Sequence, residues 1–172
     1  MSGTKHHKKR WISLYVENQV GVLAKISGLF SGKSYNLDSL TVGETEDSTV
    51  SRMTIGVTSD DITFEQIKKQ LNRSIEVIKV IDLTDMAINM KEILFVKVNS
   101  CSEKDKEEAF RIAKVFELKI VDYGKTSVLL ECLQTEERND AIIRLLNNTF
   151  LNRIEVVRGG SVAIEAISMT DR

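Results

Sequence analysis

The hydrophobic residues of this chain follow two spacings, one typical of strands and one typical of helices. The order of these spacings occurs twice along the chain, and this repeat is the feature that most constrains the fold. Ile12, Leu14 and Val16 lie on one side of an alternating segment, as in a half-buried strand. From Val22 to Phe30, apolar residues instead recur every three or four positions, the spacing of an amphipathic helix. Two alternating segments, another helical stripe and another β-branched segment follow. This order predicts a sheet covered by two helices.

The first half therefore contains six elements in the order β-α-β-β-α-β. Gly32 marks the end of the first helix, and Thr63 and Gln66 have the spacing of a capping box for the second. A polar loop at 44–48 joins the middle strands. The expected strands cover 10–16, 36–42, 49–57 and 76–83. This order is the ferredoxin-like arrangement.

The same order of elements returns after residue 91. Ser102 and Asp105 sit at capping-box spacing, and Thr135 precedes two glutamates at the start of a further helix, where the dipole favours acids. We expect Gly159 and Gly160 to stop the last strand, leaving a short apolar tail. The expected strands cover 93–98, 118–122, 126–133 and 153–158, with helical stripes at 109–116 and 142–150 and the tail at 162–167.

The repeat predicts an α+β protein built from two tandem ferredoxin-like βαββαβ domains. The halves match in the order of their elements and not in their residues, and each has the size of a small domain. We expect a flexible N-terminus at 1–9, a first domain at 10–83, a linker at 84–91 and a second domain at 92–172.

Composition excludes several classes of function. The chain has 172 residues and a formal net charge of −1, which argues against a protein built around nucleic acid or an anionic membrane. No apolar run reaches the roughly 18 residues of a membrane span, and no signal-peptide core is present. Cys101 and Cys132 lie far apart and form no CxxC motif. Free thiols in a reducing cytoplasm are the expected state.

The sequence also lacks the motifs of common catalytic sites. It contains no GxxxxGK[ST], HExxH or GxSxG, and its two histidines, His6 and His7, lie in the basic run 5–10. We interpret that run as a frayed, solvated terminus rather than a metal site or phosphate-binding arm. The carboxylates are best explained as helix caps and surface charges. An RNA-binding sheet would need paired aromatics on its central strands, where Met53 and Ile55 are found instead.

The turn at 17–23 is the candidate functional site. It joins the first strand to the first helix, whose first turn offers unpaired N–H groups and the positive end of the helix dipole. Such a site suits a small anion, for example the carboxylate of a free amino acid, and Gly21 lets a ligand approach the backbone closely. Taken alone, however, Asn and Gly in such a turn are more often only capping and turn residues.

Several segments resemble one family closely: the acetolactate synthase (acetohydroxyacid synthase) small regulatory subunits. The Asn-x-x-Gly turn is common to ACT domains in general, whereas the segments 35–42 and 51–55 are specific to this family. The resemblance is strong over the first 83 or so residues and looser in the second half. It is carried by the segments 17–23, 28–30, 35–42, 50–55, 65–71 and 77–80, then 93–98, 109–116, 120–122 and 158–159.

The resemblance implies an ACT domain followed by a second ferredoxin-like domain, without catalysis of its own. Such a subunit binds and activates a large catalytic subunit, which condenses two pyruvates to acetolactate, or pyruvate with 2-oxobutyrate, at the first common step of branched-chain amino-acid biosynthesis. It also confers feedback inhibition by branched-chain amino acids, with valine as the expected effector. Thiamine diphosphate, Mg²⁺ and FAD are expected on the catalytic subunit, and no cofactor or metal in this chain.

The resemblance also implies a homodimer, paired through the ACT domains, with the effector between the two copies. Matched positions assign the turn residues to one chain and the second strand to its neighbour. The implied effector-binding residues are Asn18, Gly21, Val22 and Leu23 from one chain and Asn36 and Leu37 from the other.

One position departs from the family pattern. A glycine commonly precedes the aromatic–Asn pair, whereas this chain has Ser34 before Tyr35 and Asn36. If that backbone needs a positive φ, Ser34 is strained by about 1–3 kcal/mol. Alternatively, Gly32 takes the role with the turn shifted. The departure bears on the identity and affinity of the effector rather than on the fold.

Two rival functions remain at this stage. A stand-alone ACT-type amino-acid sensor would bind an amino acid without a catalytic partner, and a pull-down from the source cell separates it from a regulatory subunit. A small ferredoxin-like enzyme would need a convergent polar cluster with a nucleophile or base, and the sequence shows none.

Overall fold

The computed structural model describes residues 7–32, 35 and 37–168, and these form two four-stranded sheets. Expectations that concern His6, Ser34 and Asn36 lie outside the described residues. The elements of the first sheet and its helices are β1 (Lys8–Glu17), α1 (Val22–Ser31), β2 (Leu37–Glu44), β3 (Val50–Ser59), α2 (Asp61–Leu71) and β4 (Val77–Asp82). Their strand order is β2-β3-β1-β4.

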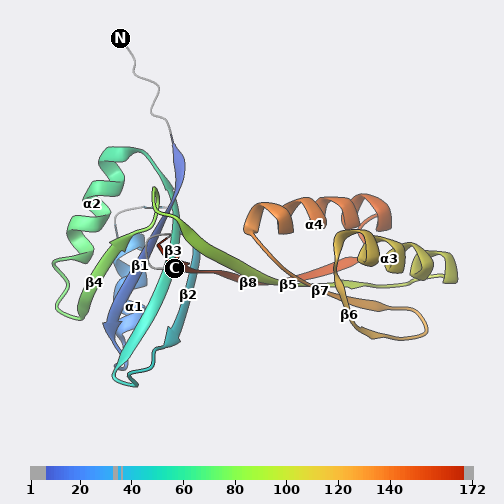
Figure 1. The fold of residues 1–172 in the computed structure, drawn as a ribbon, viewed down its shortest axis with the longest axis horizontal. Coiled ribbons are helices and arrows are strands. Elements are labelled where there is room, and N and C mark those ends of the chain that lie inside the picture. The colour runs from blue at the N-terminus through green and yellow to red at the C-terminus, as the bar shows by residue number, and fades with distance from the viewer. Residues whose placement is uncertain (1–6, 33–34, 36, 169–172) are drawn as a thin grey trace, which may run out of the picture. The chain divides into compact units, whose positions relative to one another are not determined.

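The second sheet repeats this arrangement (Figure 1). Its elements are β5 (Ile88–Val98), α3 (Glu103–Phe116), β6 (Lys119–Tyr123), β7 (Val128–Gln134), α4 (Glu136–Phe150) and β8 (Ile154–Glu165), with strand order β6-β7-β5-β8. The predicted α+β class and the double βαββαβ order are confirmed. None of the helices within the described ranges is long and apolar enough to cross a membrane.

The first sheet buries only one of its faces beneath helices. The alternating residues of β1 and β3 that were expected inside are buried together with the apolar stripes of α1 and α2. Each such side chain contributes roughly 1.5–3 kcal/mol on burial. The opposite face of the sheet carries Trp11, Ser13 and Tyr15 on the central strand β1. The prediction that Met53 and Ile55 stand in place of aromatic residues on that face was therefore wrong, because Met53 and Ile55 face the core.

The helix starts agree with the predicted caps in two of three cases. Ser102 and Asp105 form the expected capping box, and the Thr135 hydroxyl accepts a hydrogen bond from the Arg138 N–H at 3.4 Å. The capping box predicted at Thr63 and Gln66 is wrong. The carboxylate of Asp60 caps α2 by accepting from the Thr63 N–H at 2.7 Å, because α2 already begins at residue 61.

The N-terminal strand begins earlier than predicted. Lys8 and Lys9 belong to β1, so the expected flexible segment 1–9 is wrong at its end. Arg10, at the end of the basic run, is only 5% exposed. Its guanidinium pairs with Asp61 and lies 4.8 Å from the ring centre of Phe64. Strand pairing with β3 and the ion pair of Arg10 with Asp61 fix the start of β1. The charge of this segment alone would instead predict a solvated tail.

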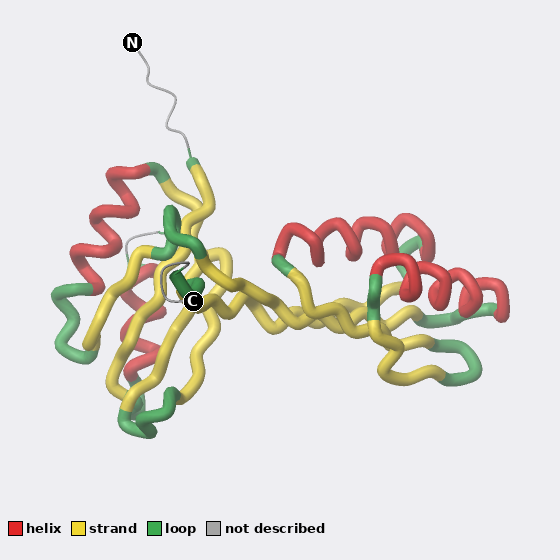
Figure 2. Tube along the Cα trace, in the orientation of Figure 1, coloured by secondary structure: helices red, strands yellow, loops and turns green. Residues whose placement is uncertain are grey.

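The last strand continues through the glycines that were expected to stop it. β8 runs without interruption from Ile154 to Glu165, and Figure 2 shows it as a single strand. A Cβ on Gly159 would lie 2.5 Å from Cγ2 of Ile93 on the neighbouring strand, and Gly160 has a φ of 80°. Glycine is therefore required here by close contact with the neighbouring strand at Gly159 and by the left-handed backbone at Gly160, not by a strand end.

The predicted domain boundaries also differ from the packing. By their internal contacts, residues 90–162 form one unit, and residues up to 89 together with those from 163 onward form the other. The predicted linker 84–91 overlaps β5, which begins at Ile88. The predicted second domain, 92–172, extends past this unit, because the described residues 163–168 pack with the first unit.

An ion pair between a buried glutamate and a partly exposed arginine joins β5 to β8 in the second unit. Glu92 is 4% exposed, and both its carboxylate oxygens accept hydrogen bonds from Arg158, at 3.0 and 2.7 Å. Asn139 donates to the same carboxylate at 2.9 Å. Burial works to raise the pKa of Glu92, but the hydrogen bonds from Arg158 and Asn139 outweigh it and hold the pKa below its ordinary value. The expectation that every carboxylate is a cap or surface charge fails here.

Arg158→Met should lower the free energy of unfolding of the second unit by about 3 kcal/mol, because it leaves a carboxylate buried without its cation. Urea unfolding followed by circular dichroism measures this, while fluorescence of the single tryptophan, Trp11, reports on the first unit. Arg111→Met is the matched control, since its partner Glu108 is on the same exposed helix surface, and should cost at most about 0.5 kcal/mol.

The same pair predicts an acid dependence. The pKa of Glu92 is lower in the folded chain than in the unfolded chain, so its stabilisation is present above the ordinary value of 4.5 and is lost as the pH falls through the folded value. Glu92→Gln should therefore flatten the acid limb of the stability curve. Equal acid dependence in this variant and in the unmodified protein would contradict the assignment.

Candidate functional site

The turn between β1 and α1 has an unusual helix start. Gly21 is the N-cap residue, with φ 89° and ψ −12°, a left-handed conformation that favours glycine. No side chain caps α1, whereas Asp60, Ser102 and Thr135 accept hydrogen bonds at the starts of the other described helices. The sequence around Gly21 therefore leaves this helix start available to a ligand.

The open helix start suits an anion. The Val22 N–H makes a long contact of 3.3 Å with the Gln19 carbonyl. The N–H groups of Leu23 and Ala24 lie in the first turn of the helix, where the helix has no carbonyl to accept a hydrogen bond from them. The first turn contains no acidic residue. A Cβ on Gly21 would have no heavy atom within 4 Å, so there is space beside the turn. These groups place positive potential at an accessible point.

Asn18 ties this turn to the loop between β2 and β3. Its side-chain amide donates to the Ser48 carbonyl at 2.9 Å and to the Glu44 carboxylate at 3.3 Å. Its side-chain oxygen accepts from the Ser51 hydroxyl at 3.0 Å. Both amide hydrogens are thus occupied, and one lone pair of the oxygen remains for a further donor.

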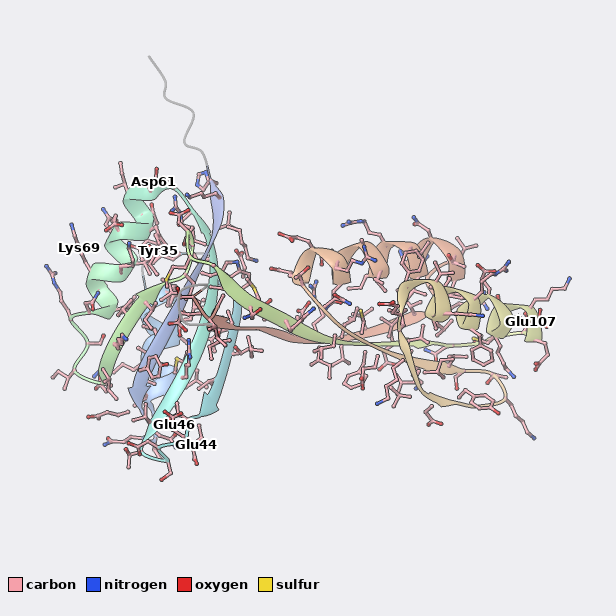
Figure 3. All side chains as sticks on the ribbon, in the orientation of Figure 1. Tyr35, Glu44, Glu46, Asp61, Lys69 and Glu107 are labelled. Atoms are coloured by element: carbon pink, nitrogen blue, oxygen red, sulfur yellow. The ribbon has the colours of Figure 1, made fainter. Side chains whose placement is uncertain are left out.

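The remaining predicted site residues fall into two groups. Leu23 is exposed beside the turn, and Val22 is buried beneath it. Leu37 begins the edge strand β2, and its register opposite Val57 sets it at the end of the strand far from the turn, more than ~20 Å along β2. Figure 3 labels Tyr35 and Glu44, which lie near these opposite ends. One chain therefore does not bring its own turn and Leu37 together.

Lys25 is a charged neighbour of the turn that sequence reasoning missed. It lies one helical turn after Gly21 and pairs with Glu76, which precedes β4. The hydrogen bond from Lys25 is the largest cause that holds the pKa of Glu76 below its ordinary value. The i+4 spacing from Gly21 could have been used to predict that Lys25 lies beside the turn. The pairing of Lys25 with Glu76 could not be predicted, because no local pattern in the sequence places residue 76 near residue 25.

Within the described ranges, no group of three or more His, Cys, Asp or Glu side chains is placed to hold a metal ion. Cys101 and Cys132 are buried free thiols, and burial raises the pKa of each. The strongest chemical feature of the first unit is thus an open, uncharged helix start on a ferredoxin-like domain. An open helix start on such a domain suits a small anion.

Comparison with known proteins identifies the family. Residues 12–79 match the model of the "AHAS small subunit-like ACT domain", and residues 91–167 match that of the "Small subunit of acetolactate synthase". The acetolactate synthase small subunit of Aquifex aeolicus is 40% identical over 157 residues, covering 91% of this chain and 81% of that protein. A probable acetolactate synthase small subunit of Methanothermobacter thermautotrophicus is 38% identical, covering 92% and 94%.

A solved structure agrees with these matches. The acetolactate synthase small subunit of Thermotoga maritima has a TM-score of 0.84 and 32% identity, covering 94% of this chain and 99% of that one. The chain belongs to the family of acetolactate synthase small subunits, which are regulatory and not catalytic. Its first unit is an ACT domain.

Asn18→Ala should loosen the turn. The variant loses three side-chain hydrogen bonds at an exposed site, and each contributes about 0.5–1 kcal/mol at most. We expect the first unit to lose about 1–2 kcal/mol of stability in urea, measured by Trp11 fluorescence. Gln19→Ala is the matched control in the same turn, because Gln19 hydrogen-bonds to Glu17 and Val22 through its backbone, and it should change stability by less than about 0.5 kcal/mol. Equal effects of the two changes would show that Asn18 does not hold the turn.

Proposed function

We propose that this chain confers feedback inhibition on a large catalytic subunit by binding a branched-chain amino acid, with valine as the expected effector, at the β1–α1 turn. The observation that carries the proposal is the uncapped, left-handed helix start at Gly21 in a chain of this family. The match of both units to small-subunit models favours this over a stand-alone amino-acid sensor.

The turn offers a partner to each end of an amino-acid zwitterion. The N–H groups of Leu23 and Ala24 suit the carboxylate, because they are unpaired in the helix and lie at its positive end. The remaining lone pair of the Asn18 side-chain oxygen suits the ammonium. The exposed side chain of Leu23 supplies apolar contact for a branched aliphatic group.

A dimer completes this proposed site. β2 is an edge strand, and an exposed edge favours pairing with another strand. The length of β2 lies between Leu37 and the turn of the same chain. In a two-fold pair, residues Asn36 and Leu37 of the site would therefore come from the neighbouring chain. The site would then exist only in the dimer, and the effector would strengthen it.

The catalytic partner supplies the chemistry. Thiamine diphosphate, Mg²⁺ and FAD would reside on the large subunit, and this chain would raise the activity of that subunit. The cytoplasm is the proposed location, where the two free thiols stay reduced.

Gly21→Asp should abolish inhibition while sparing activation. The added carboxylate enters the open space beside the turn and repels the carboxylate of the effector by several kcal/mol in a partly desolvated site, and each 1.4 kcal/mol lowers affinity about tenfold. The test titrates valine, leucine and isoleucine against acetolactate synthesis by the reconstituted complex.

Gly21→Asn is the matched control for this variant. Asparagine has the size of aspartate and tolerates a left-handed backbone, but carries no charge. It should keep part of the inhibition that the aspartate variant loses. Wild-type inhibition in the aspartate variant would mean that the effector site is not at this turn.

A further inference from the structure

The open face of the first sheet is occupied by the end of β8. The Ala163 N–H donates to the hydroxyl of Thr54 on β3 at 3.3 Å, and the Ala166 N–H donates to the Ala87 carbonyl at 2.9 Å. Ser13 on β1 is fully buried although it faces away from the helices. Residues 163–166 thus cover part of a sheet face that would otherwise be solvated.

Arg52 is the polar centre of this contact. Its Nε donates to the Ser13 hydroxyl at 2.8 Å, and its terminal nitrogen donates to the Glu165 carboxylate at 2.8 Å. The guanidinium lies 5.0 Å from the ring centre of Tyr15. Hydrogen bonds from the backbone N–H of Glu165 itself and from the Arg52 side chain hold the pKa of the Glu165 carboxyl below its ordinary value. This carboxylate is therefore charged at neutral pH.

The residue before Arg52 contacts the proposed effector turn. Ser51 donates its hydroxyl to the side-chain oxygen of Asn18 at 3.0 Å, from the opposite face of the strand. Successive residues of β3 therefore contact the turn and the end of β8. Residues 154–162 of the same strand β8 belong to the second unit, so the backbone of β8 connects Glu165, the ion-pair partner of Arg52, to that unit.

We propose that Arg52 is a positioning residue that transmits effector binding from the turn to the second unit through Glu165. An ammonium at the remaining lone pair of the Asn18 oxygen shares that oxygen with the Ser51 hydroxyl, and a shift of β3 there moves Arg52 relative to Glu165. The effector regulates only if it favours one arrangement of these groups over another. The inference rests on the proposed function, since it needs an effector at the turn.

Glu165→Gln tests the coupling, because it keeps the size of the side chain and removes the charge that pairs with Arg52. Calorimetry measures valine binding to the isolated protein, and acetolactate synthesis by the reconstituted complex measures activation and maximal inhibition. We expect valine binding and activation by this variant to stay within about twofold of wild type. Maximal inhibition should fall below about half of the wild-type value, because the variant binds the effector but transmits less of its effect.

Asp82→Asn is the matched control. It removes the charge of another ion pair of the first unit, with Lys68, whose side chains are exposed to a similar degree as those of Arg52 and Glu165. That pair joins α2 to β4, and the other polar partners described for it are Glu65 on α2 and Thr84 after β4. Binding, activation and inhibition should all stay at wild-type levels.

Exchange of the charges provides a second test. Arg52→Glu combined with Glu165→Arg restores an ion pair with reversed polarity and should recover part of the inhibition that Glu165→Gln loses. Full inhibition in Glu165→Gln, or loss of valine binding by that isolated variant, would overturn the coupling role. Absence of any valine response in the wild-type complex would instead overturn the proposed function, and this inference with it.

Discussion

The first sheet must bury one face beneath two helices, and the architecture around the turn follows from that constraint. β1 and β3 supply the inner face with apolar side chains that pack against α1 and α2. The chain must therefore reverse at the end of β1 within four residues, from Glu17 to Val22. Gly21 makes the reversal possible with a left-handed backbone, and in doing so leaves the start of α1 without a side-chain cap.

Arginine side chains fix the elements that the apolar core does not reach. Arg10 holds the start of β1 to α2, Arg52 holds the end of β8 to the first sheet, and Arg158 holds the middle of β8 to the buried Glu92. The planar guanidinium can bond a carboxylate and further acceptors at once. Each of these ion pairs joins segments that are distant in the sequence, so the pairs set long-range geometry rather than local helix stability.

The element order could be predicted because it depends on local periodicity. Alternation and helical spacing survive in the single sequence, and the fully buried apolar residues of β1, α1 and α4 lie among the expected ones. Most of the errors involve distant partners. Gly159 is small because Ile93 lies against it, and Glu92 is buried because Arg158 reaches it from β8. Neither neighbour is visible from spacing alone.

The candidate site was predictable in part. The resemblance and the turn chemistry pointed to Gly21 and Asn18, and the structure adds that most of the Asn18 side chain is already hydrogen-bonded within the chain. The ion pair of Lys25 with Glu76 and the contact of Glu165 with Arg52 were not predictable, because each depends on how β4 or β8 packs.

Mixed dimers test most directly whether two chains share one effector site. A Gly21→Asp chain and an Asn36→Leu chain, co-expressed with different tags, would form dimers in which one site carries both changes and the other carries neither. A two-fold shared site predicts no valine binding by either parent dimer and about one valine per mixed dimer in calorimetry. A mixed dimer that binds no more valine than its parents would contradict the shared site, as would normal binding by either parent.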